Sequence, residues 1–100
     1  MSDLPRLTGK ESLILDLLIN QAGELYGLQM VNNSDGKLKL GTLYTTLNRM
    51  EDKGYIQSRK EAPRPGARGL PRRLYEPTGL GQRVHSAWLA ANQHWAGAIV

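Results

Sequence analysis

The feature that most constrains this chain is a segment in which no regular structure can continue. Residues 61–73 hold three prolines, two glycines and four arginines. Proline lacks the amide hydrogen that helices and inner strands need, and glycine favours turns. The stretches on either side, residues 55–60 and 74–76, have strand-like composition. The sequence therefore predicts a β-hairpin whose connecting loop is proline-rich and strongly basic.

A first helix is predicted over residues 8–22. Thr8 and Glu11 have the spacing of a capping box, in which each side chain accepts a hydrogen bond from the other residue's amide. Gly23 is suited to end the helix, because glycine readily adopts the left-handed conformation found there.

A shorter second helix is predicted at about residues 25–33. Its apolar residues Leu25, Leu28 and Val31 repeat every three positions, and a cluster of Asn, Ser, Asp and Gly follows it as a turn. The alternating residues 37–40 are either a very short strand or the lead-in to the next helix.

The third predicted helix, residues 41–53, has two contrasting faces. Its buried stripe is expected to consist of Leu43, Leu47 and Met50. The opposite face carries polar side chains: Thr42, Thr45, Asn48, Arg49 and Asp52. Such groups bond to phosphates and base edges, although a polar face is equally typical of a helix that only faces water.

The last predicted helix begins after Pro77, with Thr78 as its capping residue. It carries an apolar stripe at steps of three and four residues: Leu80, Val84, Trp88, Ala91 and Trp95. The stripe packs either on its own domain or on a second copy of the chain, and we expect a dimer interface. The two tryptophans are also suited to line a pocket for a flat ligand, but an interface is the favoured interpretation.

The order of these elements is that of a winged helix-turn-helix. The predicted fold class is therefore mainly α with a small β-hairpin, followed by one C-terminal dimerisation helix. Residues 1–77 are expected to form a DNA-binding domain, with the wing at about 55–76. Residues 78–100 are expected to form the helix that pairs two subunits.

Positive charge is concentrated in the middle of the chain. The 100 residues carry a formal net charge of +4. Residues 37–73 hold ten lysines and arginines against three acidic residues, whereas residues 1–36 hold two against five. Such clustering indicates a polyanionic partner rather than general solubility.

The residue inventory argues against several other classes. The chain has no cysteine, so it has no disulfide and no thiolate metal site, which fits a cytoplasmic protein. His85 and His94 lie too far apart on one helix to bind a metal together, and they are expected to be exposed polar residues or groups that titrate at the dimer seam. No serine nucleophile pattern and no glycine-rich phosphate loop is recognisable, so we predict no enzymatic activity, no metal and no cofactor. No apolar run approaches the roughly 20 residues that span a membrane.

Four segments together resemble the PadR family of transcriptional regulators. Residues 40–56 begin with Leu-Gly-Thr-Leu-Tyr and end with Gly-Tyr-Ile, like the family's third helix. Residues 24–30 contain the Tyr-Gly pair of its second helix, residues 72–81 resemble the end of its wing, and residues 7–18 fit its first helix. The resemblance covers about residues 7–90.

This resemblance implies a dimeric repressor that binds a palindromic operator in double-stranded DNA. The last helix of each subunit would cross to its partner, and the dimer seam is a candidate site for a small aromatic or cationic effector, since some members of the family bind such compounds between the subunits. The implied location is cytoplasmic and nucleoid-associated, in a bacterium or phage. Thr45 departs from the family pattern, which often has proline at this position.

The expected DNA contacts come from three places. They are Lys37 and Lys39 before the third helix, Thr42, Tyr44, Thr45, Asn48 and Arg49 on it, and Arg64, Arg68, Arg72 and Arg73 in the wing. Strand alternation predicts that Arg72 and Arg73 point to opposite faces, so that one of them points away from DNA. Tyr44 is alternatively a cover for the junction of helix and wing, and Arg49 is alternatively the partner of Glu51, Asp52 or Asp16.

The alternative function is a winged-helix module that uses its basic wing to grip an acidic partner protein. The Thr, Tyr, Asn and Arg side chains of the third helix favour DNA over that alternative, because they match base edges and phosphates.

Overall fold

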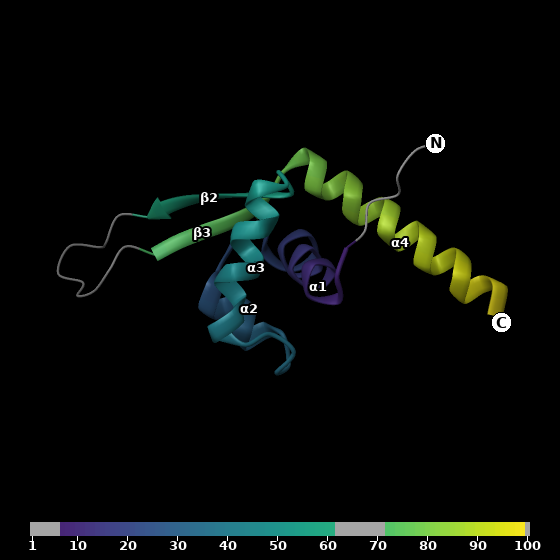
Figure 1. The fold of residues 1–100 in the computed structure, drawn as a ribbon, viewed down its shortest axis with the longest axis horizontal. Helices are drawn as coiled ribbons and strands as arrows, with labels where there is room; N and C mark the ends of the chain where they lie inside the picture. Colours follow the sequence, from purple (N-terminus) through teal and green to yellow (C-terminus); the bar gives the residue numbers. More distant parts are fainter. Residues whose placement is uncertain (1–6, 62–71, 100) are drawn as a thin grey trace.

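The computed structural model describes residues 7–61 and 72–99, with side chains in the last helix described as far as Ala91. The elements follow one another as α1 (Gly9–Leu17), η1 (Leu18–Ala22), β1 (Leu25–Tyr26), α2 (Gly27–Asn33), α3 (Leu40–Asp52), β2 (Ile56–Glu61), β3 (Arg72–Pro77) and α4 (Gly79–Ile99). The predicted fold class, mainly helical with a small sheet, is confirmed. The hairpin of β2 and β3 projects to one side of the helices, and α4 extends to the other (Figure 1).

The first helix is stabilised at its N-terminus as predicted. The Thr8 hydroxyl accepts the Glu11 amide at 3.1 Å, and the Glu11 carboxylate accepts the Thr8 amide at 3.0 Å. The helix continues into the π-helical turn η1, and Gly23 follows it with a φ of +78°. The predicted extent and ends are confirmed, whereas the wider π turn was not foreseen.

The second predicted helix begins two residues later than expected. Leu25 and Tyr26 form β1, which pairs antiparallel with Tyr75 and Leu74 of β3, so the sheet has the order β1-β3-β2. The spacing of apolar residues suited a helix, but hydrogen bonds to β3 decide the backbone conformation here. Leu28 is 58% exposed, so the apolar spacing of Leu25, Leu28 and Val31 does not mark one buried face.

The core lies between the helices and one face of the sheet. It consists mainly of buried aliphatic residues from every element around it: Ile14, Leu15, Leu17, Leu18, Leu25, Met30, Leu38, Leu43, Leu47, Met50, Ile56 and Tyr75. Leu38 shows that residues 37–40 are a lead-in rather than a strand, because its side chain is buried and its amide donates to the Ser34 hydroxyl at 3.0 Å.

The start of α4 is tied to the hairpin and to the end of α3. The Thr78 hydroxyl accepts the Gly81 amide at 2.9 Å, as a capping residue should, and donates to the Gly54 carbonyl at 2.6 Å. The Thr78 amide also donates to the Tyr55 carbonyl at 3.1 Å. Gly81 lies so close to this carbonyl that a Cβ atom built on it would be 1.9 Å from the Tyr55 oxygen. The sequence gives no sign of this contact, since Gly81 looks only like a poor helix former.

A partly buried ion pair joins α1 to the residue that follows α3. Glu11 is 1% exposed, and its Oε2 accepts a hydrogen bond from the Lys53 Nζ at 2.9 Å. Burial alone would raise the pKa of Glu11, but the bonds from the Thr8 amide and the Lys53 ammonium outweigh burial and lower it.

The lowered pKa of Glu11 predicts a loss of stability in acid. Glu11 binds a proton less readily in the folded chain than in the unfolded chain, so its contribution to stability is present above the ordinary pKa of 4.5 and is lost as the pH falls through the folded value. We expect the free energy of unfolding of the native protein and of Glu11→Gln, measured with urea, to converge as the pH falls below this value. A difference that stays constant with pH would contradict the role of the charge.

Candidate nucleic-acid interface

The exposed face of α3 carries the polar residues expected there. Thr42, Thr45, Asn48, Arg49 and Asp52 are all exposed, while Leu43, Leu47 and Met50 are buried. Within the described residues Arg49 takes part in no ion pair, so the predicted alternative partners do not hold it. The helix runs unbroken through Thr45, from Leu40 to Asp52. This leaves the guanidinium of Arg49 and the amide of Asn48 accessible to an external partner.

Tyr44 lies at the edge of this face and is 46% exposed. Its hydroxyl is so close to α2 that a Cβ atom built on Gly27 would be 2.6 Å from it. The ring therefore covers the first residue of α2, and the glycine there leaves room for the tyrosine. Half of the side chain stays free to meet a partner.

The two lysines before α3 lie in different surroundings. Lys39 is the exposed residue that immediately precedes the helix. Lys37 instead lines a cavity that is also bordered by Ser12, His85 and Trp88, on the side of α1 and α4. The structure therefore brings Lys39 to the start of α3 and Lys37 to a separate hollow.

The two described wing arginines point to opposite faces of the sheet, as alternation predicts. Arg73 donates to the Ser58 hydroxyl at 2.9 Å, and that hydroxyl donates to the Glu51 carboxylate of α3 at 3.0 Å. Arg73 thus lies on the α3 side. Arg72 lies on the outer face, with its guanidinium 5.0 Å from the centre of the Tyr26 ring. Arg64 and Arg68 lie outside the described residues.

Lys60 is a basic residue that is not among the DNA contacts predicted from the sequence. It pairs directly with Arg73 in the register of β2 and β3, and it is exposed. Both side chains therefore emerge on the α3 side of the hairpin. The alternation of Ser58 and Lys60 in the sequence would have revealed this position once the face of Ser58 was known.

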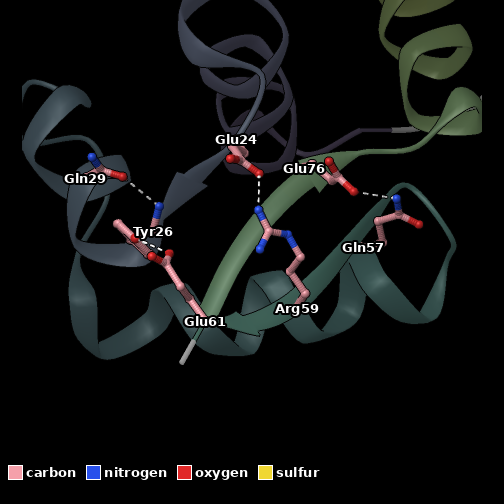
Figure 2. A network of polar contacts seen from close by, with 7 residues as sticks. All are labelled: Glu24, Tyr26, Gln29, Gln57, Arg59, Glu61 and Glu76. Atoms are coloured by element: carbon pink, nitrogen blue, oxygen red, sulfur yellow. Dashed lines mark hydrogen bonds and ion pairs between the residues drawn. The ribbon is translucent and has the colours of Figure 1, made fainter. Parts of the chain in front are cut away.

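Polar pairs cover the outer face of the same sheet (Figure 2). Arg59 donates to Glu24 at 3.1 Å, Gln57 donates to Glu76 at 2.6 Å, and the Tyr26 hydroxyl donates to Glu61. These partners neutralise Arg59 locally, in contrast with Arg49 on α3. The outer face is thus internally paired, and the α3 side carries the accessible cations.

The hydrogen bond between Tyr26 and Glu61 affects the pKa of the Tyr26 phenol. Hydrogen bonding to the Glu61 carboxylate raises the pKa of Tyr26 above its ordinary value of 10.0. We expect Glu61→Gln to lower that pKa, because the neutral amide no longer favours the protonated phenol. Tyrosine Cζ chemical shifts followed against pH measure this. An unchanged titration of Tyr26 in the variant would show that the bond does not form in solution.

The family model for the PadR-like family of transcriptional regulators matches residues 14–87. This chain belongs to that family. The predicted resemblance is confirmed, and PadR-like proteins regulate transcription rather than catalyse a reaction. No curated protein matches the chain as a relative.

Solved structures of several transcriptional regulators share this fold. A PadR family regulator from Eggerthella lenta is 22% identical with a TM-score of 0.73, covering 90% of this chain and 77% of that one. A transcriptional regulator from Clostridium thermocellum is 26% identical with a TM-score of 0.69, covering 89% and 87%. Bacillus subtilis PadR, solved in complex with operator DNA, is 24% identical with a TM-score of 0.69. The match covers 84% of this chain but only 48% of the Bacillus protein.

The stripe expected to pair two PadR-like subunits is divided in this structure. Val84 is only 5% exposed, so its side chain is already covered by its own chain. Leu80 and Ala91 are exposed, Trp88 is half-buried, and the side chain of Trp95 is outside the described part. Only part of the stripe is therefore accessible to a partner.

His85 contradicts the expectation of an exposed polar residue. It is 4% exposed, and its Nε2 lies 3.7 Å from the Asp16 Oδ1 because α4 packs on α1. Together with Trp88 and Lys37 these residues line a cavity of about 480 Å³. Among the described residues, no cluster of groups suited to hold a metal ion occurs, and no helix is long and apolar enough to cross a membrane.

Proposed function

We propose that this chain is a dimeric repressor that binds a palindromic operator, with α3 in the major groove and the wing against the phosphate backbone. The observation that carries the proposal is the accessible polar face of α3, flanked on the same side of the sheet by Lys60 and Arg73. The operator complex of Bacillus subtilis PadR supports it by analogy. The proposed base contacts are Thr42, Tyr44, Thr45, Asn48 and Arg49. The proposed phosphate contacts are Lys39, Arg73 and, from the sequence, Arg64 and Arg68.

Fluorescence anisotropy with duplexes selected from the source genome tests the proposal. Affinity should fall steeply with salt, because each phosphate contact releases a counterion. One duplex should be preferred over scrambled sequence at the same salt. No binding at low salt would instead favour a module that grips an acidic protein.

A matched pair of arginines tests which face of the wing meets DNA. We expect Arg73→Ala to weaken binding to all duplexes and to lower the salt slope by about one. Arg59→Ala should leave both unchanged, because Arg59 lies on the outer face and is paired with Glu24. Equal losses in the two variants would contradict the proposed orientation.

The second half of α4 is the proposed dimer contact, so that residues 1–77 bind DNA and residues 78–100 pair the subunits. Ala91 is exposed on the stripe, and Ser86 is exposed on the opposite side of the same helix. We expect Ala91→Glu to shift sedimentation equilibrium toward monomer, because it places a charge in the apolar contact, and Ser86→Glu to leave the dimer intact. If sedimentation equilibrium shows the native protein to be a monomer, this part of the proposal is contradicted.

The cavity beside Trp88 is the proposed effector site. Its wall combines the indole ring with the charged groups of Lys10, Asp16 and Lys37, and the indole suits a flat aromatic ligand. Tryptophan fluorescence titrated with a panel of aromatic compounds, both cationic and anionic, should respond. A flat titration across the panel would count against a ligand of this class.

A further inference from the structure

The first turn of α3 carries an apolar surface that the fold of the chain itself does not use. Leu40 is 48% exposed and Tyr44 is 46% exposed, in contrast with the buried Leu43 and Leu47. Residues four apart lie one turn above each other on the same side of a helix. Single exposed leucines are ordinary, but this one adjoins an exposed tyrosine on a helix whose other exposed residues are polar.

Gly41 lies beside this apolar pair, and nothing in the described part of the chain requires a glycine there. A Cβ atom built on it would meet nothing within 4 Å, and its φ is not in the left-handed region. Glycine within a helix is less favourable than alanine by about 1 kcal/mol. The missing side chain leaves the backbone between Leu40 and Tyr44 open, so a rigid external surface can approach closely.

The charge beside the surface suits a polyanion. Lys39 immediately precedes Leu40; it is exposed, and it is in no ion pair among the described residues. Of the groups that base pairs present in the major groove, the 5-methyl of thymine is the apolar one. An apolar surface next to a lysine, on a helix proposed to lie in the major groove, therefore fits thymine better than any other base.

We propose that Leu40, with Tyr44, reads thymine 5-methyl groups and so sets part of the operator sequence. This inference rests on the proposed function and adds Leu40 as a residue that determines specificity. Tyr44 is held in position by its contact with Gly27, so its ring and the Leu40 side chain form one edge. The operator should then contain a thymine in each half-site where the first turn of α3 lies.

Uracil substitution tests the proposal, because uracil differs from thymine only by this methyl group. Each thymine of the selected operator is replaced in turn, and affinity is measured by anisotropy at fixed salt. We expect the native protein to lose about fourfold in affinity at one thymine per half-site, as one buried methyl group predicts. Leu40→Ala should bind the thymine duplex more weakly and should lose little further on uracil substitution.

Leu28→Ala is the matched control, because Leu28 is also an exposed leucine but lies on α2. It should keep the full uracil sensitivity of the native protein, and circular dichroism should show that both variants fold. Duplex binding without uracil sensitivity would overturn this inference and leave the proposed function standing. Equal sensitivity in the native protein and Leu40→Ala would overturn the assignment to Leu40. Absence of any duplex binding would overturn both.

Discussion

Replacing Gly81 with alanine should lower the free energy of unfolding by about 3 kcal/mol or more, the upper range for overpacking a tight contact. The added Cβ atom would be 1.9 Å from the Tyr55 carbonyl oxygen and 2.9 Å from its carbon. These are backbone atoms, so no side-chain rotation relieves the clash. The hairpin and the start of α4 would have to separate, and the Thr78 amide bond to the same carbonyl would weaken.

Gly79 provides a matched control in the same helical turn. A Cβ atom there meets only the Nη1 of the exposed Arg83, at 3.4 Å. Alanine is a better helix former than glycine by up to about 1 kcal/mol, so Gly79→Ala should be neutral or stabilising. Urea unfolding of the two variants measures both effects. Similar values for Gly79→Ala and Gly81→Ala would mean that the approach to Tyr55 does not control stability.

The second large effect is expected at Glu11. Glu11→Ala should cost about 2–4 kcal/mol, because it removes the glutamate half of the capping box of α1 and the buried partner of Lys53. Lys53 is 38% exposed and can be rehydrated, which keeps the loss below that of a fully buried pair. Thermal and urea unfolding at neutral pH measure the loss.

Glu11→Gln and Lys53→Met separate the two roles of this carboxylate. Glutamine still accepts the Thr8 amide in a capping box, so Glu11→Gln should cost less than Glu11→Ala. Lys53→Met leaves the Glu11 charge buried without its partner, and it should destabilise the protein most at neutral pH and less in acid. A Lys53→Met variant as stable as the native protein would show that Glu11 acts through the cap alone.

The elements that the sequence predicted well are those whose signals lie within a single helix or turn. The Thr8–Glu11 capping box and the stripe of Leu43, Leu47 and Met50 each depend on spacing along one element. Thr78 likewise caps α4 as expected. Such signals survive folding because the groups that satisfy them are only a few residues away.

The predictions that failed depend on contacts between distant segments. Leu25 has helical spacing with Leu28 and Val31, but Leu25 and Tyr26 pair with β3 about 50 positions further along the chain. The helix therefore begins only at Gly27, and α2 buries Met30 while Leu28 is exposed. His85 is buried because α4 packs on α1.

The candidate interface divides in the same way. The sequence selected the exposed side of α3, since helical geometry alone separates Thr42, Thr45 and Asn48 from the buried stripe. It also gave the alternation of Arg72 and Arg73. That Arg73 rather than Arg72 lies on the α3 side is shown only by its hydrogen bond to Ser58, which bonds to Glu51. No local sequence pattern marked Lys60 or Leu40 as a contact residue.

The amino-acid sequence by itself determined the family, the order of the four helices and the hairpin, the capped ends of the first and last helices, and the position of the basic segment, because these follow from local spacing, caps and turn residues. Tertiary structure decided which side of the hairpin carries accessible cations, why Gly81 has no side chain, and that Lys37 and His85 border a cavity beside Trp88. The physical reason is that close approach, burial and ion pairing depend on distances between elements, and those distances exist only once the helices pack against the sheet and one another.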